Sequence, residues 1–131
     1  LPIGSLSRNR TDMVIRDSQR LALQQSKQDD FVDRLLLHFG KVWPEKVAAL
    51  GPEARTWIAA GVTAGNRYGL QTEQEIARFV NLWFVWGRGF EDAREHRWAS
   101  IILHDKERKS HVKIHQLSYE TKMRLAARKE D

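Results

Sequence analysis

Hydrophobic residues recur with helical spacing along most of the chain, and the pattern is sharpest between Gly51 and Phe90. Pro52 is typical of the first turn of a helix, because its missing N–H would have no intrahelical partner there. Gly69 predicts the end of this helix near Tyr68, since glycine adopts the left-handed conformation without steric cost. The pattern therefore predicts a first, well-delimited helix.

A second helix is predicted directly after it. Thr72 and Glu75 have the spacing of a capping box, in which each side chain bonds the backbone N–H of the other residue. The apolar residues that follow share one helical face: Ile76, Phe79, Val80, Trp83 and Phe84. Gly87 and Gly89 predict its end. Because the connection is short, we expect the two helices to pack side by side and roughly antiparallel.

Weaker patterns predict the remaining helices. Apolar positions support a long helix over 17–40, stopped by Gly40, whose polar middle over 24–30 faces solvent or bends. Pro44 predicts the start of a short helix. The segment 91–97 has a polar composition that predicts a surface connection. The residues after Trp98 return to helical spacing.

The last helix is predicted from Ser110, as N-cap, to about Arg128. Its apolar residues form a thin stripe that offers little burial for so long a helix: Val112, Ile114, Leu117, Met123 and Leu125. Two alternatives stay open. The helix packs on the body and frays, or its exposed stripe joins a partner, which includes self-association.

These elements predict an all-α fold, a compact bundle of about five to six helices with a protruding or partner-bound C-terminal basic helix. We divide the chain into a disordered lead-in or tag (1–12), a helical bundle domain (13–105) and a basic C-terminal helix (106–131). We expect the bundle to fold without 110–131. Met13 is the expected native start, the alternative being a longer chain that was processed.

Composition narrows the class of protein. The 131 residues are 41% hydrophobic and 30% charged, which is typical of one globular domain. There is no cysteine, which excludes disulfides, thiolate zinc sites and thiol nucleophiles and fits a reducing cytosol. No apolar run approaches the roughly 20 residues of a membrane span. We therefore expect a cytoplasmic protein with no membrane partner.

Charge is distributed unevenly along the chain. Between Met13 and Asp105, twelve Lys and Arg residues balance twelve Asp and Glu residues. From Lys106 onward eight basic residues face only four acidic ones, so most of the formal net charge of +5 lies in the last quarter. A basic end on a neutral body predicts an acidic partner surface.

The sequence contains no pattern that indicates catalysis. Serines and glycines form no GxSxG, GxGxxG or phosphate-loop motif. His111 and His115 share a helix face, but two imidazoles do not complete a zinc site. His96 is expected to be solvated, beside Glu95 and Asp92. We predict a protein that is not an enzyme and has no catalytic residue, metal or cofactor.

Partner binding is the remaining class of site. Trp86 lies beside a Gly-Arg-Gly-Phe segment and is placed to edge a groove, where Trp and Arg are enriched. The basic helix supplies the other candidates. The predicted partner-binding residues are Trp86, Arg88, Phe90, Leu117, Lys122, Arg124, Leu125 and Arg128.

Positions spread from Met13 to Ala99 together form a recognisable set: Met13, Val14, Ile15, Arg16, Gln19, Leu23, Phe31, Arg34, His38, Phe39, Trp43, Pro44, Gly51, Arg55, Ile58, Gly61, Tyr68, Gly69, Glu75, Phe79, Leu82, Phe84, Gly87, Phe90, Trp98 and Ala99. With these positions, the region from Met13 to about Leu103 resembles a family of small, mostly uncharacterised bacterial proteins encoded beside type VI secretion spike and effector genes. The resemblance implies a cytoplasmic adaptor, chaperone or co-chaperone. Its partner would be a secreted effector, the effector's adaptor or the spike protein. No catalytic residues come with it.

Three functions from different classes follow. The first is this non-enzymatic accessory role. The second is an immunity protein that neutralises a toxin, against which the neutral body argues mildly. The third is a nucleic-acid-binding module that uses the basic helix, although that part of the chain offers only Tyr119 for base stacking.

Overall fold

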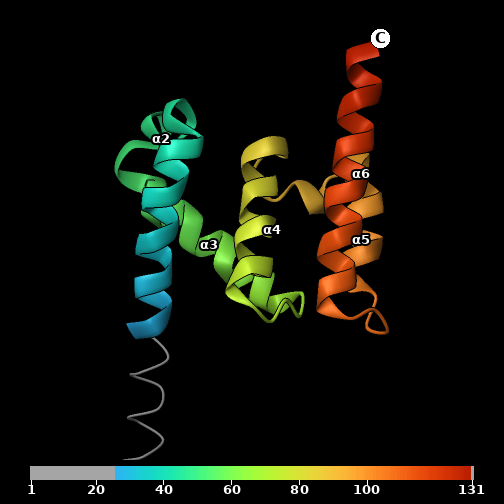
Figure 1. Cartoon of the computed structure of the whole chain (residues 1–131), viewed down its shortest axis with the longest axis horizontal. Coiled ribbons are helices and arrows are strands. Elements are labelled where there is room, and N and C mark those ends of the chain that lie inside the picture. The colour runs from blue at the N-terminus through green and yellow to red at the C-terminus, as the bar shows by residue number, and fades with distance from the viewer. Residues whose placement is uncertain (1–25, 131) are drawn as a thin grey trace, which may run out of the picture.

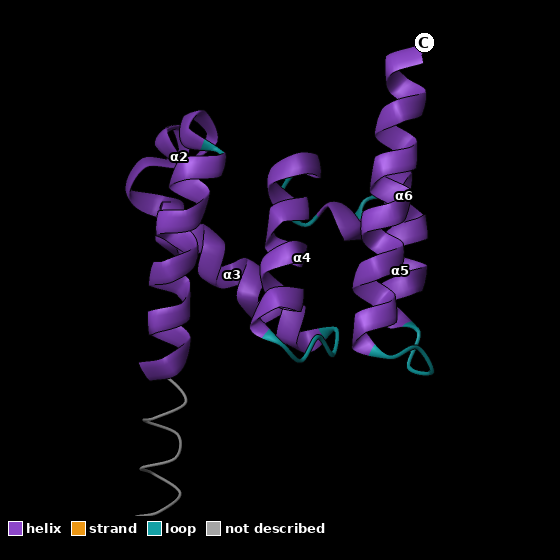
Figure 2. Ribbon diagram, in the orientation of Figure 1, coloured by secondary structure: helices purple, strands orange, loops and turns teal. Residues whose placement is uncertain are grey.

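Every regular element between residues 26 and 130, the part of the chain that the computed structural model describes, is a helix (Figures 1 and 2). The expected all-α fold is confirmed. An N-terminal helix is described over 26–42. The elements that follow are α2 (Pro44–Leu50), η1 (Gly51–Glu53), α3 (Ala54–Arg67), α4 (Glu73–Trp86), η2 (Phe90–Asp92), η3 (Arg94–His96), α5 (Arg97–His104) and α6 (Ser110–Glu130).

The local signals around α3 and α4 are confirmed. Pro52 lies in the 3-10 turn that leads into α3, and Gly69, with a φ of 85°, follows its end. The Thr72 hydroxyl accepts a hydrogen bond from the Glu75 amide at 3.1 Å, and the Glu75 carboxylate accepts one from the Thr72 amide at 3.2 Å. Gly87, with a φ of 112°, ends α4.

Helices α3 and α4 pack against each other as expected (Figure 1). Trp57 meets Trp83 edge to face at a ring distance of 5.5 Å, and Tyr68 meets Phe79 at 5.6 Å. Gly61 of α3 lies directly against Val80 and Trp83. The largest fully buried side chains come from five helices and mark the centre of the core: Val32, Phe39, Ile58, Val62, Phe79, Val80, Leu103 and Leu117.

The N-terminal helix passes the expected stop at Gly40. It continues to residue 42 and ends before Pro44, with the Trp43 amide bonded to the Phe39 carbonyl at 2.7 Å. Gly40 keeps a helical φ, whereas the proline forces Trp43 out of the helical region. The described part of the polar stretch, 26–30, is helical. The expected start at Asp17 and the lead-in 1–12 lie outside the described residues.

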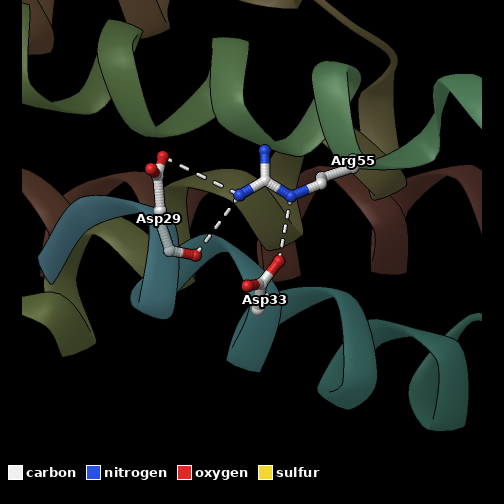
Figure 3. Close-up of polar contacts among 3 residues, drawn as sticks. All are labelled: Asp29, Asp33 and Arg55. Atoms are coloured by element: carbon white, nitrogen blue, oxygen red, sulfur yellow. Dashed lines mark hydrogen bonds and ion pairs between the residues drawn. The ribbon is translucent and has the colours of Figure 1, made fainter. Parts of the chain in front are cut away.

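Ion pairs on the surface connect the N-terminal helix to α3 and α4. Arg34 makes a two-pronged contact with Glu73 at the start of α4, with a shortest distance of 2.7 Å. Arg55 of α3 lies between Asp33 at 2.9 Å and Asp29 at 3.8 Å (Figure 3). These neighbouring carboxylates raise the pKa of both guanidinium groups, with the Glu73 and Asp33 hydrogen bonds as the largest causes.

The prediction that 91–97 is a polar surface connection holds for Asp92, Arg94, Glu95 and Arg97, which are exposed, but is wrong for Glu91. The segment folds into η2 and η3, and Glu91 is only 2% exposed. Its carboxylate accepts hydrogen bonds from the Tyr68 hydroxyl at 2.8 Å and from the Trp83 indole at 3.0 Å. Donors from α3 and α4 thus compensate for the burial of this side chain.

Helix α6 packs on α4 and α5 through its first half, and its C-terminal end extends beyond them (Figure 1). Ile114 and Leu117 are core residues, so this half belongs to the bundle. Ser110 is the first residue of α6, not its cap, and its hydroxyl donates to Glu75 at 3.2 Å. Between residues 26 and 130, no helix is long and apolar enough to cross a membrane.

Candidate functional site

The eight predicted partner-binding residues occupy three different environments. Two of them, Phe90 and Leu117, are buried in the core. Phe90 packs against Phe79, and Leu117 is 0% exposed on the inner face of α6. Because neither is accessible in the folded chain, their assignment to a partner surface is wrong.

Trp86 and Arg88 lie at the C-terminal end of α4. The Trp86 indole is half-buried and donates to the Thr121 hydroxyl of α6 at 3.1 Å. The exposed Arg88 guanidinium lies 5.9 Å from the centre of the Trp83 ring. Both residues line a pocket beside α2. Trp86 therefore lies at the edge of a groove, as predicted from the sequence.

The other four predicted residues belong to the last turns of α6. The Arg124 guanidinium stacks over Trp98 at 4.6 Å and pairs with Glu120 at 3.4 Å. Arg128 stacks over Trp86 at 5.0 Å. These cation–π contacts hold the end of α6 against the body. Leu125 is half-buried and Lys122 is exposed.

A cleft of about 610 Å³ separates the outer faces of α5 and α6. Trp98 and Ile101 line it from α5, and Tyr119 and Arg124 line it from α6. Three large apolar side chains on or beside this cleft are exposed to solvent: Ile101 (58%), Tyr119 (56%) and Met123 (52%). We call the surface formed by Trp98, Ile101, Tyr119, Met123 and Arg124 the α5–α6 face.

Charges around the cleft are largely paired within the chain. Arg108 contacts Asp105 at 2.9 Å, and Arg124 contacts Glu120. Two polar atoms in the cleft wall, the Trp98 indole nitrogen and the Gln116 amide oxygen, are buried without a hydrogen-bond partner in the described part of the chain. The α5–α6 face therefore presents apolar area next to ion pairs that are already formed within the chain.

The sequence pattern missed Ile101, Tyr119 and Trp98 as members of this surface. Ile101 is three residues after Trp98, which suggested a shared face, but Ala99, Ile102 and Leu103 form the buried face of α5 and Ile101 lies on its outer side. Met123 was part of the weak stripe of the last helix. One feature of the sequence pointed to this surface: the apolar stripe of the last helix extends further than the part of α6 that packs on the core.

Histidines are the side chains that the sequence offers as metal ligands. Among residues 26–130, no group of three or more His, Asp and Glu side chains is placed to hold a metal ion. His104 contacts the Ser100 carbonyl at 2.9 Å. His96 is not solvated as expected, since its ring lies 4.8 Å from Trp86 and 5.5 Å from Phe90.

Two ionisable side chains in the bundle have shifted pKa values with structural causes. Burial would raise the pKa of Glu75, but hydrogen bonds from the Gln71 and Thr72 amides and the Ser110 hydroxyl outweigh it and lower the pKa. Burial raises the pKa of Tyr68, and its bond to the Glu91 carboxylate raises it further. Both groups form hydrogen bonds that connect different helices.

The chain matches no family model, no curated protein and no solved structure.

Proposed function

We propose that the protein is a non-enzymatic accessory protein of type VI secretion, an adaptor, chaperone or co-chaperone that works in the cytoplasm. Its partner is a secreted effector, the effector's adaptor or the spike protein. The observation that carries the binding role is the α5–α6 face. The link to type VI secretion rests on the sequence resemblance between Met13 and Leu103.

The exposed apolar area supports protein binding. Ile101 and Tyr119 line one cleft, and Met123 is exposed one helical turn after Tyr119. Clustered exposed apolar side chains mark interaction surfaces in soluble proteins. Arg124 and Trp98 belong to the residue types enriched at binding hot spots. Burying such side chains removes apolar surface from water, at about 25 cal/mol per Å² before association costs are subtracted.

The other two functions have less support. A nucleic-acid interface is favoured by aromatic side chains among its cations, and the basic helix offers only Tyr119 for base stacking, while Arg108 and Arg124 pair with carboxylates. A mobility-shift assay at about 50 mM salt would reveal such binding, because electrostatic binding is strongest at low salt. The equal numbers of acidic and basic residues between Met13 and Asp105 argue mildly against a toxin-blocking role.

The test is co-purification of the tagged chain with the effector, adaptor and spike proteins encoded beside its gene, each supplied one at a time. We expect one of them to bind in stoichiometric amount. Ile101→Glu and Tyr119→Glu should each weaken binding at least tenfold, since each places a charge in the apolar contact.

The matched control is Leu37→Glu, because Leu37 is an equally apolar side chain, 70% exposed, on the N-terminal helix away from the cleft. It should bind like the unchanged protein. If none of these proteins binds, the proposed partner class is wrong. If Leu37→Glu weakens binding as much as Ile101→Glu, the assignment of the α5–α6 face is wrong.

A further inference from the structure

A second pocket, of about 430 Å³, lies where α2 meets the C-terminal end of α4. Ala49 lines it from α2, Trp57 from α3, and Trp83, Trp86 and Arg88 from α4 and the residues that follow it. None of its lining residues lines the cleft between α5 and α6. It is therefore a separate site on the molecule.

The walls of this pocket are mainly aromatic and are held in place by the core. Trp57 packs against Phe84 at a ring distance of 4.5 Å and against Trp83 at 5.5 Å. Trp83 and Phe84 are buried, whereas Trp57 and Trp86 are only partly covered. Rigid, partly exposed aromatic rings offer a large apolar contact at low cost in conformational entropy.

The charged side chains that line this pocket are basic. Among residues 26–130 they are Lys46 and Arg88, and no acidic residue of that range lines it. The Lys46 ammonium is already bonded to the Phe84 carbonyl and stacked on Trp43 at 4.8 Å. Arg88 is exposed and belongs to none of the ion pairs among residues 26–130. Its guanidinium lies over the Trp83 ring at 5.9 Å and pairs with no carboxylate of these residues, at the rim of an apolar pocket.

We propose that this pocket binds a segment of a protein partner that presents a large apolar side chain next to a carboxylate. The apolar side chain fills the space between Ala49 and the indole rings, and the carboxylate pairs with Arg88. Arginine is suited to this role because its planar fork binds a carboxylate through two hydrogen bonds. The volume is at the small end of ligand pockets, typically about 300–1,000 Å³, and matches one or two residues.

This pocket shares no lining residue with the cleft of the α5–α6 face, although Trp86 at its edge packs against Trp98 at a ring distance of 6.2 Å, and it does not depend on the type VI assignment. With two sites that have separate lining residues, one chain can hold two protein segments at the same time. An adaptor must hold two partners at once, and two binding sites on one chain allow this. Its test uses small probes, so that its failure does not bear on the co-purification experiment.

The probe is N-acetyl-leucine, compared with the neutral N-acetyl-leucinamide, and the readout is the indole N–H spectrum of the ¹⁵N-labelled full chain. We expect N-acetyl-leucine to shift the signals of Trp57, Trp83 and Trp86 with a dissociation constant on the order of millimolar, the strength typical of so small a ligand. The amide should bind several-fold more weakly. Arg88→Gln should remove that difference, and Arg94→Gln, at an exposed arginine outside the pocket, should keep it.

Filling the pocket provides a second measurement. Ala49→Phe places a ring in the space and should abolish the shifts, whereas Ala48→Phe, at an exposed neighbour on α2 that does not line the pocket, should not. The proposal is overturned if the acid and the amide bind equally to the unchanged protein. It is also overturned if Ala49→Phe binds normally, or if all five indole signals shift alike.

Discussion

The Lys113 ammonium group donates a hydrogen bond to the backbone carbonyl of Tyr68 at 2.8 Å, so a buried cation of α6 caps the C-terminal end of α3. The same ammonium donates to the Leu103 carbonyl at 3.0 Å, in the last turn of α5. The C-terminal end of a helix carries unpaired carbonyls and partial negative charge, which a cation stabilises. The Lys113 side chain thus links α6 to the C-terminal ends of α3 and α5.

Replacing Lys113 by methionine should lower the free energy of unfolding by about 1–3 kcal/mol, because it leaves two buried carbonyl oxygens without a donor. Chemical denaturation followed by tryptophan fluorescence measures this. The control is Lys109→Met, at an exposed lysine, which should change stability by less than about 0.5 kcal/mol. Equal stability of Lys113→Met and the unchanged protein would show that the ammonium contributes nothing net.

The first half of α6 should be indispensable to the fold. Leu117 is fully buried and Ile114 nearly so, and Leu117→Ala should cost about 2–5 kcal/mol because it leaves a cavity. Met123→Ala, at an exposed position on the same helix, should cost far less. Deleting 110–131 should abolish cooperative thermal unfolding. A truncated bundle that still unfolds cooperatively would restore the sequence-based expectation that it folds without this helix.

Two glycines of α3 should respond in opposite directions to alanine. A Cβ on Gly61 would lie 3.0 Å from the Val80 side chain and 3.3 Å from Trp83, both fixed in the core, so Gly61→Ala should destabilise by about 1–3 kcal/mol. A Cβ on Gly65 would meet Ile76 at an ordinary 3.5 Å. Gly65→Ala should therefore gain helix propensity, up to about 1 kcal/mol. Thermal unfolding of the pair, measured side by side, distinguishes the outcomes.

Glu75 should make stability depend on pH on the acid side. Its pKa is lower in the folded chain than the ordinary 4.5, so the carboxylate stabilises the fold above that value. This contribution is lost as the pH falls through the folded pKa. Glu75→Gln should therefore be less stable than the unchanged protein at pH 7, and the difference should narrow below about pH 4.

Thr72→Ala provides the comparison for Glu75. It removes the hydroxyl that accepts from the Glu75 amide and leaves the carboxylate in place. Loss of this cap should cost about 1 kcal/mol at every pH and preserve the acid-side slope. If Glu75→Gln retained the full slope, other carboxylates would account for the acid sensitivity.

The sequence by itself determined the helical class and the ends of the best-delimited helices. Proline at 44, glycine at 69 and 87, and the Thr72–Glu75 pair act on their nearest neighbours in the chain, through backbone sterics and hydrogen bonds a few residues long. Such effects do not depend on the rest of the fold, which is why these predictions are confirmed.

Tertiary structure alone decided which polar residues are buried and which apolar residues are left exposed. Glu91 is in the core because Tyr68 and Trp83, from two other helices, supply its donors, and Lys113 is buried because α3 and α5 end beside it. Ile101 is exposed because the bundle covers the face of α5 that carries Ala99, Ile102 and Leu103. Burial is a property of what the other elements place around a side chain, and no local pattern contains that information.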